Sequence, residues 1–146
     1  MKNHMNLIFD AVSENESFAR VSVAAFLTGL DPSLEELGDV KTAVSEAVTN
    51  VIIHSGCEQV EIRAEIDNDL LTIEIIDTGV GIENIKKAME PLFTTKADEE
   101  RSGMGFSFME AFMDTLFVDS RVGEGTRVHM TKRIRKPAFL REPVLQ

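Results

Sequence analysis

The stretch QVEIRAEIDNDLLTIEIID, residues 59–77, decides the fold, because it contains two runs in which apolar and polar side chains alternate. The apolar members are Val60, Ile62, Ala64 and Ile66 in the first run and Leu71, Ile73 and Ile75 in the second. Alternation with a period of two residues indicates strands that bury only one face. The turn residues Asp67-Asn68-Asp69 separate the runs, so the stretch predicts a hairpin that ends at Asp77.

One strand and two helices are predicted on the N-terminal side of this hairpin. An alternating run over residues 6–11 suggests a short first strand. Residues 13–16 and 33–36 both read S-x-x-E, which is the pattern of a helix capping box. We therefore expect one helix from the first box to about Gly29. The second helix should continue to about His54, where Gly56 follows as a stop signal.

A short helix, a loop, a longer helix and a second hairpin are predicted on the C-terminal side. Residues 82–90 suit the short helix, and residues 91–104 are polar and loop-like. Helical spacing then relates Phe106, Met109, Phe112, Met113 and Leu116, and residues 117–122 and 126–132 flank Gly123-Glu124-Gly125. The element order predicts an α+β fold: a two-layer α/β sandwich whose mixed, mostly antiparallel sheet carries helices on one face. We expect one domain over residues 1–136 and a flexible tail over residues 137–146.

The composition limits the classes of function. The chain has 146 residues, 43% of them hydrophobic, which is enough for one packed core. Its formal net charge of −10 argues against direct nucleic-acid binding, which needs a basic surface. No apolar run is long enough for a membrane span, and the N-terminus does not resemble a signal peptide. A single cysteine, Cys57, excludes an internal disulfide, and we expect a cytoplasmic location. The basic run at residues 132–136 is either an interaction patch or a solvated strand end.

Glu46 and Asn50 lie four residues apart in SEAVTN, residues 45–50. At helical spacing they fall together on one flank of the second helix, away from the centre of its apolar face. A carboxylate and a carboxamide on one stripe can hold a metal ion and orient a hydroxyl group, and Mg²⁺ prefers oxygen ligands. Taken alone, the pair is better explained as polar residues on a solvated helix face.

IDTGVGI, residues 76–82, is the first of two glycine-rich segments. Its glycines, Gly79 and Gly81, would let the main chain approach a ligand closely. Asp77, however, would repel a phosphate group. Alone, this D-x-G-x-G pattern is also compatible with an ordinary turn.

The second glycine-rich segment is Ser102-Gly103-Met104-Gly105-Phe106, at the start of a predicted helix. Main-chain N–H groups and the helix dipole suit an anion at such a position. Thr94, Thr95, Lys96 and Arg101 precede it and could donate to phosphate oxygens. Acidic residues at 98–100 oppose that use, so a surface lid explains the mixed charge as well.

In their order and spacing, these three features resemble the N, G1 and G2 boxes of the GHKL ATP-binding superfamily, over roughly residues 35–132. SEAVTN is typical of the small anti-sigma-factor serine kinases in that superfamily. The resemblance to the sporulation members extends over nearly the whole chain through NESFARV (15–21), LDP (30–32), PLFTTK (91–96) and ERSGMGF (100–106). It implies the Bergerat ATP-binding fold. P-loop and Rossmann patterns are absent.

The resemblance implies ATP or ADP and Mg²⁺ as ligands and a role for each candidate residue. Glu46 would be the general base that deprotonates an attacking serine hydroxyl, and Asn50 would bind Mg²⁺. Asp77 would accept a hydrogen bond from the adenine amino group, which gives its charge a use. The other implied adenine-site residues are Gly79, Gly81 and Thr126. The residues implied to surround the phosphates are Thr95, Lys96, Arg101, Ser102, Gly103, Met104, Gly105 and Phe106, with Lys96 and Arg101 contacting the terminal phosphate.

The partners implied by the resemblance are an RNA polymerase sigma factor, which would be inhibited, and an anti-anti-sigma factor, which would supply the phosphoacceptor serine. A homodimer is also implied, and Arg20 is a candidate partner contact, although a solvent-facing arginine explains it equally well. The alternatives are an ATP-dependent sigma-binding module and a histidine-kinase-like ATPase domain, both without serine kinase activity. A carboxylate at Glu46 favours phosphoryl transfer, because binding alone does not require it.

Overall fold

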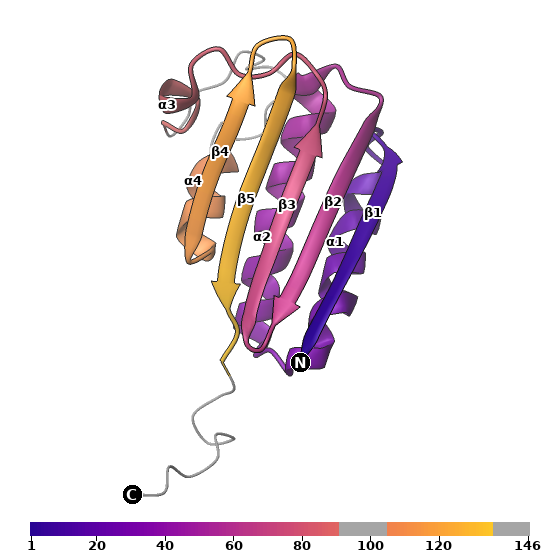
Figure 1. Ribbon diagram of the computed structural model, residues 1–146, viewed down its shortest axis with the longest axis vertical. Coiled ribbons are helices and arrows are strands. Elements are labelled where there is room, and N and C mark those ends of the chain that lie inside the picture. The colour runs from indigo at the N-terminus through magenta and orange to yellow at the C-terminus, as the bar shows by residue number, and fades with distance from the viewer. Residues whose placement is uncertain (91–104, 136–146) are drawn as a thin grey trace, which may run out of the picture.

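The chain folds around a five-stranded sheet with the order β1-β2-β3-β5-β4, as Figure 1 shows for the computed structural model, which describes residues 1–90 and 105–135. The strands are β1 (Lys2–Asp10), β2 (Gln59–Asp67), β3 (Leu70–Asp77), β4 (Thr115–Arg121) and β5 (Gly125–Arg133). All four strand pairs are antiparallel. The expected two-layer α+β sandwich is confirmed. The parallel component of the expected mixed sheet does not occur among the described strands, because β1 joins the sheet beside β2 and antiparallel to it.

The helices α1 (Asn15–Leu27), α2 (Leu34–Asn50) and α4 (Gly105–Phe112) cover one face of this sheet (Figure 1). A short helix, α3 (Ile85–Ala88), follows β3. A 3-10 turn at Thr28–Leu30 follows α1, and a π-helical turn at Val51–Ser55 follows α2. The expected loop at residues 91–104 and the expected tail at residues 137–146 lie outside the described residues.

The predicted hairpin at residues 59–77 forms as expected, with Ile62 opposite Ile75 and Ala64 opposite Ile73. The apolar side chains of both runs lie on the helix-covered face and are at most 3% exposed. They pack with the apolar stripe of α2 into one core. The alternating pattern therefore identified the buried face of the two central strands correctly.

The two predicted capping boxes have different outcomes. Ser33 accepts a hydrogen bond from the Glu36 N–H at 3.0 Å, and Glu36 Oε1 accepts from the Ser33 N–H at 2.9 Å, which completes the box at the start of α2. The box at residues 13–16 was wrong, because α1 begins without a side-chain cap. Glu16 instead accepts a short hydrogen bond from the Ser45 hydroxyl of α2. A contact between helices thus replaces the local cap.

Gly56 ends the helical segment as predicted, with a positive φ of 68°. The helical path of α2 continues through the π-helical turn to Ser55, close to the predicted end. Among the described residues, none of the helices has the length and apolar character needed to cross a membrane.

Candidate functional site

Asp77 is a buried carboxylate at the end of β3. The residue is only 7% exposed, and its Oδ1 accepts a hydrogen bond from the Gly79 N–H at 2.9 Å. Burial raises the pKa of Asp77, and hydrogen bonds from the main chain of Gly79 and Thr126 partly offset that rise. A carboxylate in this position is well suited to accept a hydrogen bond from a ligand's amino group.

The glycines of residues 76–82 are required by close packing of main chain against main chain. A Cβ atom on Gly79 would lie 2.1 Å from the Ser55 carbonyl oxygen, and the Val80 N–H donates to the same oxygen at 2.8 Å. Gly81 has a φ of +78°, and a Cβ there would lie 2.3 Å from the Arg121 carbonyl oxygen. The loop after β3 is therefore fixed between the end of the α2 segment and the turn between β4 and β5.

Thr126 lies directly beside Asp77, because the two residues are paired across β3 and β5. Its hydroxyl lies 2.7 Å from the hydroxyl of Ser120 on β4. The Ser120 oxygen also accepts from the Ile82 N–H at 2.7 Å and donates to the Gly125 carbonyl oxygen at 3.1 Å. The structure thus brings Thr126 beside Asp77, and its implied role at an adenine site stays a prediction.

Ser55 and Ser120 are two supporting residues that the sequence analysis did not identify. Ser55 is 6% exposed, and its Oγ accepts from the Cys57 N–H at 3.0 Å. Each serine joins the loop after β3 to a segment that is distant in sequence. Neither serine belongs to a recognisable motif. The only sequence signal for Ser55 is its position at a helix end, just before Gly56. The only signal for Ser120 is its place on the inward side of a predicted strand.

Asn50 lies at the last residue of α2 and against the first residue of α4. Both terminal atoms of its carboxamide are 3.1 Å from the position that a Cβ on Gly105 would take. Gly105 is buried, and the next residue, Phe106, is half-buried and packs against the core. The structure therefore brings the predicted metal ligand to the start of the predicted phosphate-binding helix.

Glu46 lines an open hollow of about 680 Å³ between α1 and α2. Arg20 of α1 lines the same hollow, and its Nε lies 3.3 Å from Glu16 Oε1. The side chain of Arg20 is 35% exposed, so it is neither buried nor simply directed into solvent. The hydroxyl-bearing residues of the lining are Ser13, Thr42, Ser45 and Thr49. The predicted base and the predicted partner contact therefore share one accessible surface.

Thr95, Lys96, Arg101, Ser102, Gly103 and Met104 lie outside the described residues, so their predicted contacts with phosphate stay predictions. Within the described ranges 1–90 and 105–135, no group of three or more His, Cys, Asp or Glu side chains could hold a metal ion. Mg²⁺ commonly keeps several waters and binds through one or two protein oxygens together with substrate phosphates. The carboxamide of Asn50, at the start of α4, fits that kind of coordination.

Three comparisons relate the chain to known proteins. Residues 9–132 match the model of the histidine kinase-like ATPase domain. A protein of Clostridium beijerinckii named anti-sigma F factor is 59% identical over 136 residues, which cover 90% of this chain and 94% of the relative. A protein of the same name from Bacillus licheniformis is 53% identical over 144 residues, which cover 96% and 99%.

A solved structure has a similar fold. It contains the RsbU and RsbW domains of a Mycobacterium tuberculosis protein, and it matches with a TM-score of 0.67 at 16% sequence identity. The match covers 93% of this chain and 34% of that longer chain. At this identity the likeness concerns the fold.

Proposed function

This chain belongs to the histidine kinase-like ATPase family and, within it, to the anti-sigma F factors, and we propose that it uses Mg-ATP to phosphorylate a serine of an anti-anti-sigma factor. In the same proposal it binds and inhibits a sporulation sigma factor of RNA polymerase. The protein acts in the cytoplasm as a homodimer. The shared hollow of Glu46 and Arg20 is the observation that carries the kinase proposal.

That hollow supports transfer to a protein hydroxyl because it is open and contains the carboxylate needed for deprotonation. A serine on the surface of a partner can reach an open hollow, whereas it cannot reach an enclosed cavity. Arg20 and Lys41 line the same surface as Glu16 and Glu46, so it offers a partner charged groups of both signs. Arg20 is therefore proposed as a partner contact.

In the proposed reaction, Glu46 removes the proton from the serine hydroxyl as the serine oxygen bonds to the terminal phosphorus of ATP. The bond from that phosphorus to the bridging oxygen breaks, and ADP leaves. Mg²⁺ would supply neutralisation of the phosphate charge. Asn50, beside the start of α4, would hold this ion. The N-terminus of α4 would favour the negative charge of the phosphates.

The adenine end of the proposed site is formed by Asp77, Gly79, Gly81 and Thr126. Asp77 would accept from the adenine amino group, and the two glycines would let the main chain lie against the base. Lys96 and Arg101 would contact the terminal phosphate, with Thr95, Ser102, Gly103 and Met104 around the phosphate chain. Gly105 and Phe106 would complete that end.

A second candidate function is a sigma-binding module in which ATP serves as a structural ligand only. The position of Glu46 favours the kinase, because an accessible carboxylate on the helix that also carries Asn50 has no part in such a module.

The test mixes the purified protein with Mg-ATP and a candidate anti-anti-sigma protein and looks for serine phosphorylation by mass spectrometry. The proposal predicts one phosphate on one serine and release of ADP. ATP binding without any phosphate on the candidate would favour the binding module. A matched reaction with the candidate's serine changed to alanine controls for the site of modification.

A further inference from the structure

Lys132 breaks the pattern of the buried face of β5. Val128, Met130 and Ile134 point to the helix-covered side of the sheet and are at most 5% exposed. Lys132 occupies the same side, opposite the buried Leu71 in β3, and its side chain is only 13% exposed. An ammonium group in such a place is costly unless it has partners. The earlier alternatives for the basic run, a solvated strand end or an interaction patch, therefore do not describe Lys132.

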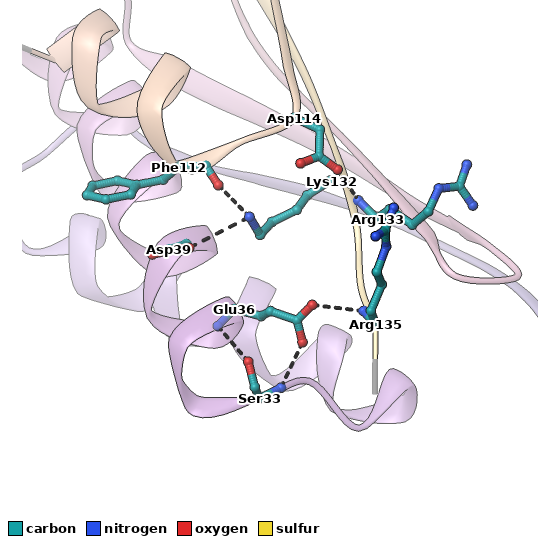
Figure 2. Close-up of polar contacts among 8 residues, drawn as sticks. All are labelled: Ser33, Glu36, Asp39, Phe112, Asp114, Lys132, Arg133 and Arg135. Carbon is teal, nitrogen blue, oxygen red and sulfur yellow. Dashed lines mark hydrogen bonds and ion pairs between the residues drawn. The ribbon is translucent and has the colours of Figure 1, made fainter. Parts of the chain in front are cut away.

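The partners of Lys132 lie on two different helices, as Figure 2 shows. Its Nζ donates to the Phe112 carbonyl oxygen, the end of α4, at 2.7 Å. The same Nζ lies 3.7 Å from Asp39 Oδ2 on α2. Carbonyl groups in the last turn of a helix lack partners within the helix and carry partial negative charge. One cation thus sits between two negative groups that would otherwise repel each other.

The remaining contacts at this end of α4 join it to the sheet. The Asp114 N–H donates to the Thr131 carbonyl oxygen at 2.9 Å. Asp114 Oδ2 accepts from the Arg133 N–H at 2.7 Å, which Figure 2 shows. These bonds fix the turn after α4 to β5 without touching α2. Lys132 adds the connection between the end of α4 and α2.

The opposite end of α4 is the end that matters for the proposed nucleotide site. Gly105 begins α4 and packs on the Asn50 carboxamide at the end of α2. The two helices therefore run antiparallel: Gly105 meets Asn50 at one end, and at the other end Lys132 of β5 bridges Phe112 of α4 and Asp39 of α2. Over the roughly 12 Å length of an eight-residue helix, a tilt at one end displaces the other end.

We propose that Lys132 is a positioning residue for the phosphate end of the nucleotide site. It holds the last turn of α4 to α2, so that the first turn of α4 stays packed on Asn50. This assignment rests on the proposed function, because it assumes that phosphates and Mg²⁺ bind beside Asn50. The assignment predicts that a largely covered cation, Lys132, affects binding of the phosphate end of the ligand and not binding of its adenine end.

The test compares ATP with adenosine as ligands of Lys132→Met, whose side chain has similar length and no charge. We expect Mg-ATP affinity to fall about tenfold, because a small displacement at the start of α4 misplaces the phosphate contacts. Adenosine affinity should stay within about twofold, because the Asp77 end has its own main-chain contacts. Lys132→Arg keeps the charge and should recover most of the ATP affinity. Calorimetric titration measures each value.

Two further variants separate positioning from general loss of stability. Arg127→Met is the matched control, because Arg127 is a cation of the same strand that pairs with Glu74 at 3.2 Å on the open face of the sheet. It should leave both affinities unchanged. Asp39→Asn removes the charge that pairs with Lys132 on α2 and should lower ATP affinity severalfold. It replaces Lys132→Met as the test variant if Lys132→Met does not fold.

An equal loss of affinity for adenosine and ATP would overturn the assignment, as would unchanged ATP affinity in folded Lys132→Met and Asp39→Asn. The failure of the proposed function is separate from these outcomes. It would appear as absence of Mg-ATP binding by the unchanged protein, and the assignment would then fail with it.

Discussion

The two ends of the proposed nucleotide site are built in different ways. At the adenine end, main-chain segments approach each other so closely that Gly79 has no space for a Cβ atom beside Ser55. At the catalytic end, Glu46 and Asn50 are side chains on one flank of α2, and the core packing of that helix does not depend on them. The difference indicates that the adenine end is coupled to folding, whereas the catalytic end can change its chemistry with little effect on stability.

Gly79→Ala should have the largest effect on stability and would break the adenine end. Its Cβ would lie 2.1 Å from the Ser55 carbonyl oxygen, so the main chain must move. We expect the free energy of unfolding to fall by about 3 kcal/mol, at the upper end of overpacking effects. Urea denaturation measures it. Gly38→Ala in α2 is the matched control, because nothing lies within 4 Å of its Cβ position and alanine favours a helix. Equal stability of the two variants would contradict the close approach.

Asp77→Asn should weaken nucleotide binding at the adenine end without lowering the stability of the fold. Loss of the charged acceptor should weaken ATP binding about 10- to 100-fold and reduce the preference for ATP over GTP. Titration calorimetry with the two nucleotides measures both effects.

The pH dependence of Asp77→Asn follows from the raised pKa of Asp77. The folded state binds this proton more tightly than the unfolded state, so ionisation of Asp77 lowers stability as the pH rises through the folded pKa. The variant lacks this loss and should be at least as stable as the unchanged protein at pH 7. Its advantage should shrink as the pH falls through the raised pKa of folded Asp77, and it should be gone below the ordinary pKa of aspartate. Urea denaturation at pH 7 and at a pH below the ordinary pKa of aspartate measures the stability difference between the variant and the unchanged protein. A variant that is less stable than the unchanged protein at pH 7 would contradict the prediction.

Gly105→Ala should have the smallest effect on stability, and it tests the contact between Gly105 and Asn50 at the catalytic end. Its Cβ would lie 3.1 Å from both terminal atoms of the Asn50 carboxamide, which is a flexible group that can shift. We expect the free energy of unfolding to change by less than about 1 kcal/mol, since alanine also favours the helix. The affinity for Mg-ATP should fall about fivefold, equivalent to about 1 kcal/mol. Calorimetry with and without Mg²⁺ measures this, and an equal loss without Mg²⁺ would argue against Asn50 as its ligand.

The parts of the fold that were predictable from the sequence depend on local patterns. The alternation in residues 59–77 gave the correct buried face, and the capping box at residues 33–36 formed because its two partners are three residues apart. The same S-x-x-E pattern failed at residues 13–16, because Glu16 has a competing partner, Ser45, 29 positions away. Such a tertiary contact leaves no mark in a local pattern.

In the candidate site, too, local patterns were predictable from the sequence and tertiary contacts were not. Spacing placed Glu46 and Asn50 on one flank of α2, and the strand end placed Asp77 beside the glycines. The hydrogen bonds of Ser55 and Ser120 depend on segments that meet only in the folded chain. The inward position of Lys132 likewise requires the strand register, since the sequence shows it only within a basic run.

Glu46→Gln tests the central claim, that a carboxylate in an open hollow makes this chain a serine kinase, most directly. The measurement is the rate of phosphate transfer to the anti-anti-sigma protein at saturating Mg-ATP, with nucleotide affinity determined in parallel. We predict unchanged nucleotide affinity and a transfer rate at least about 100-fold lower, because the amide cannot accept the serine proton. A transfer rate equal to that of the unchanged protein would contradict the role of Glu46 and the account built on it.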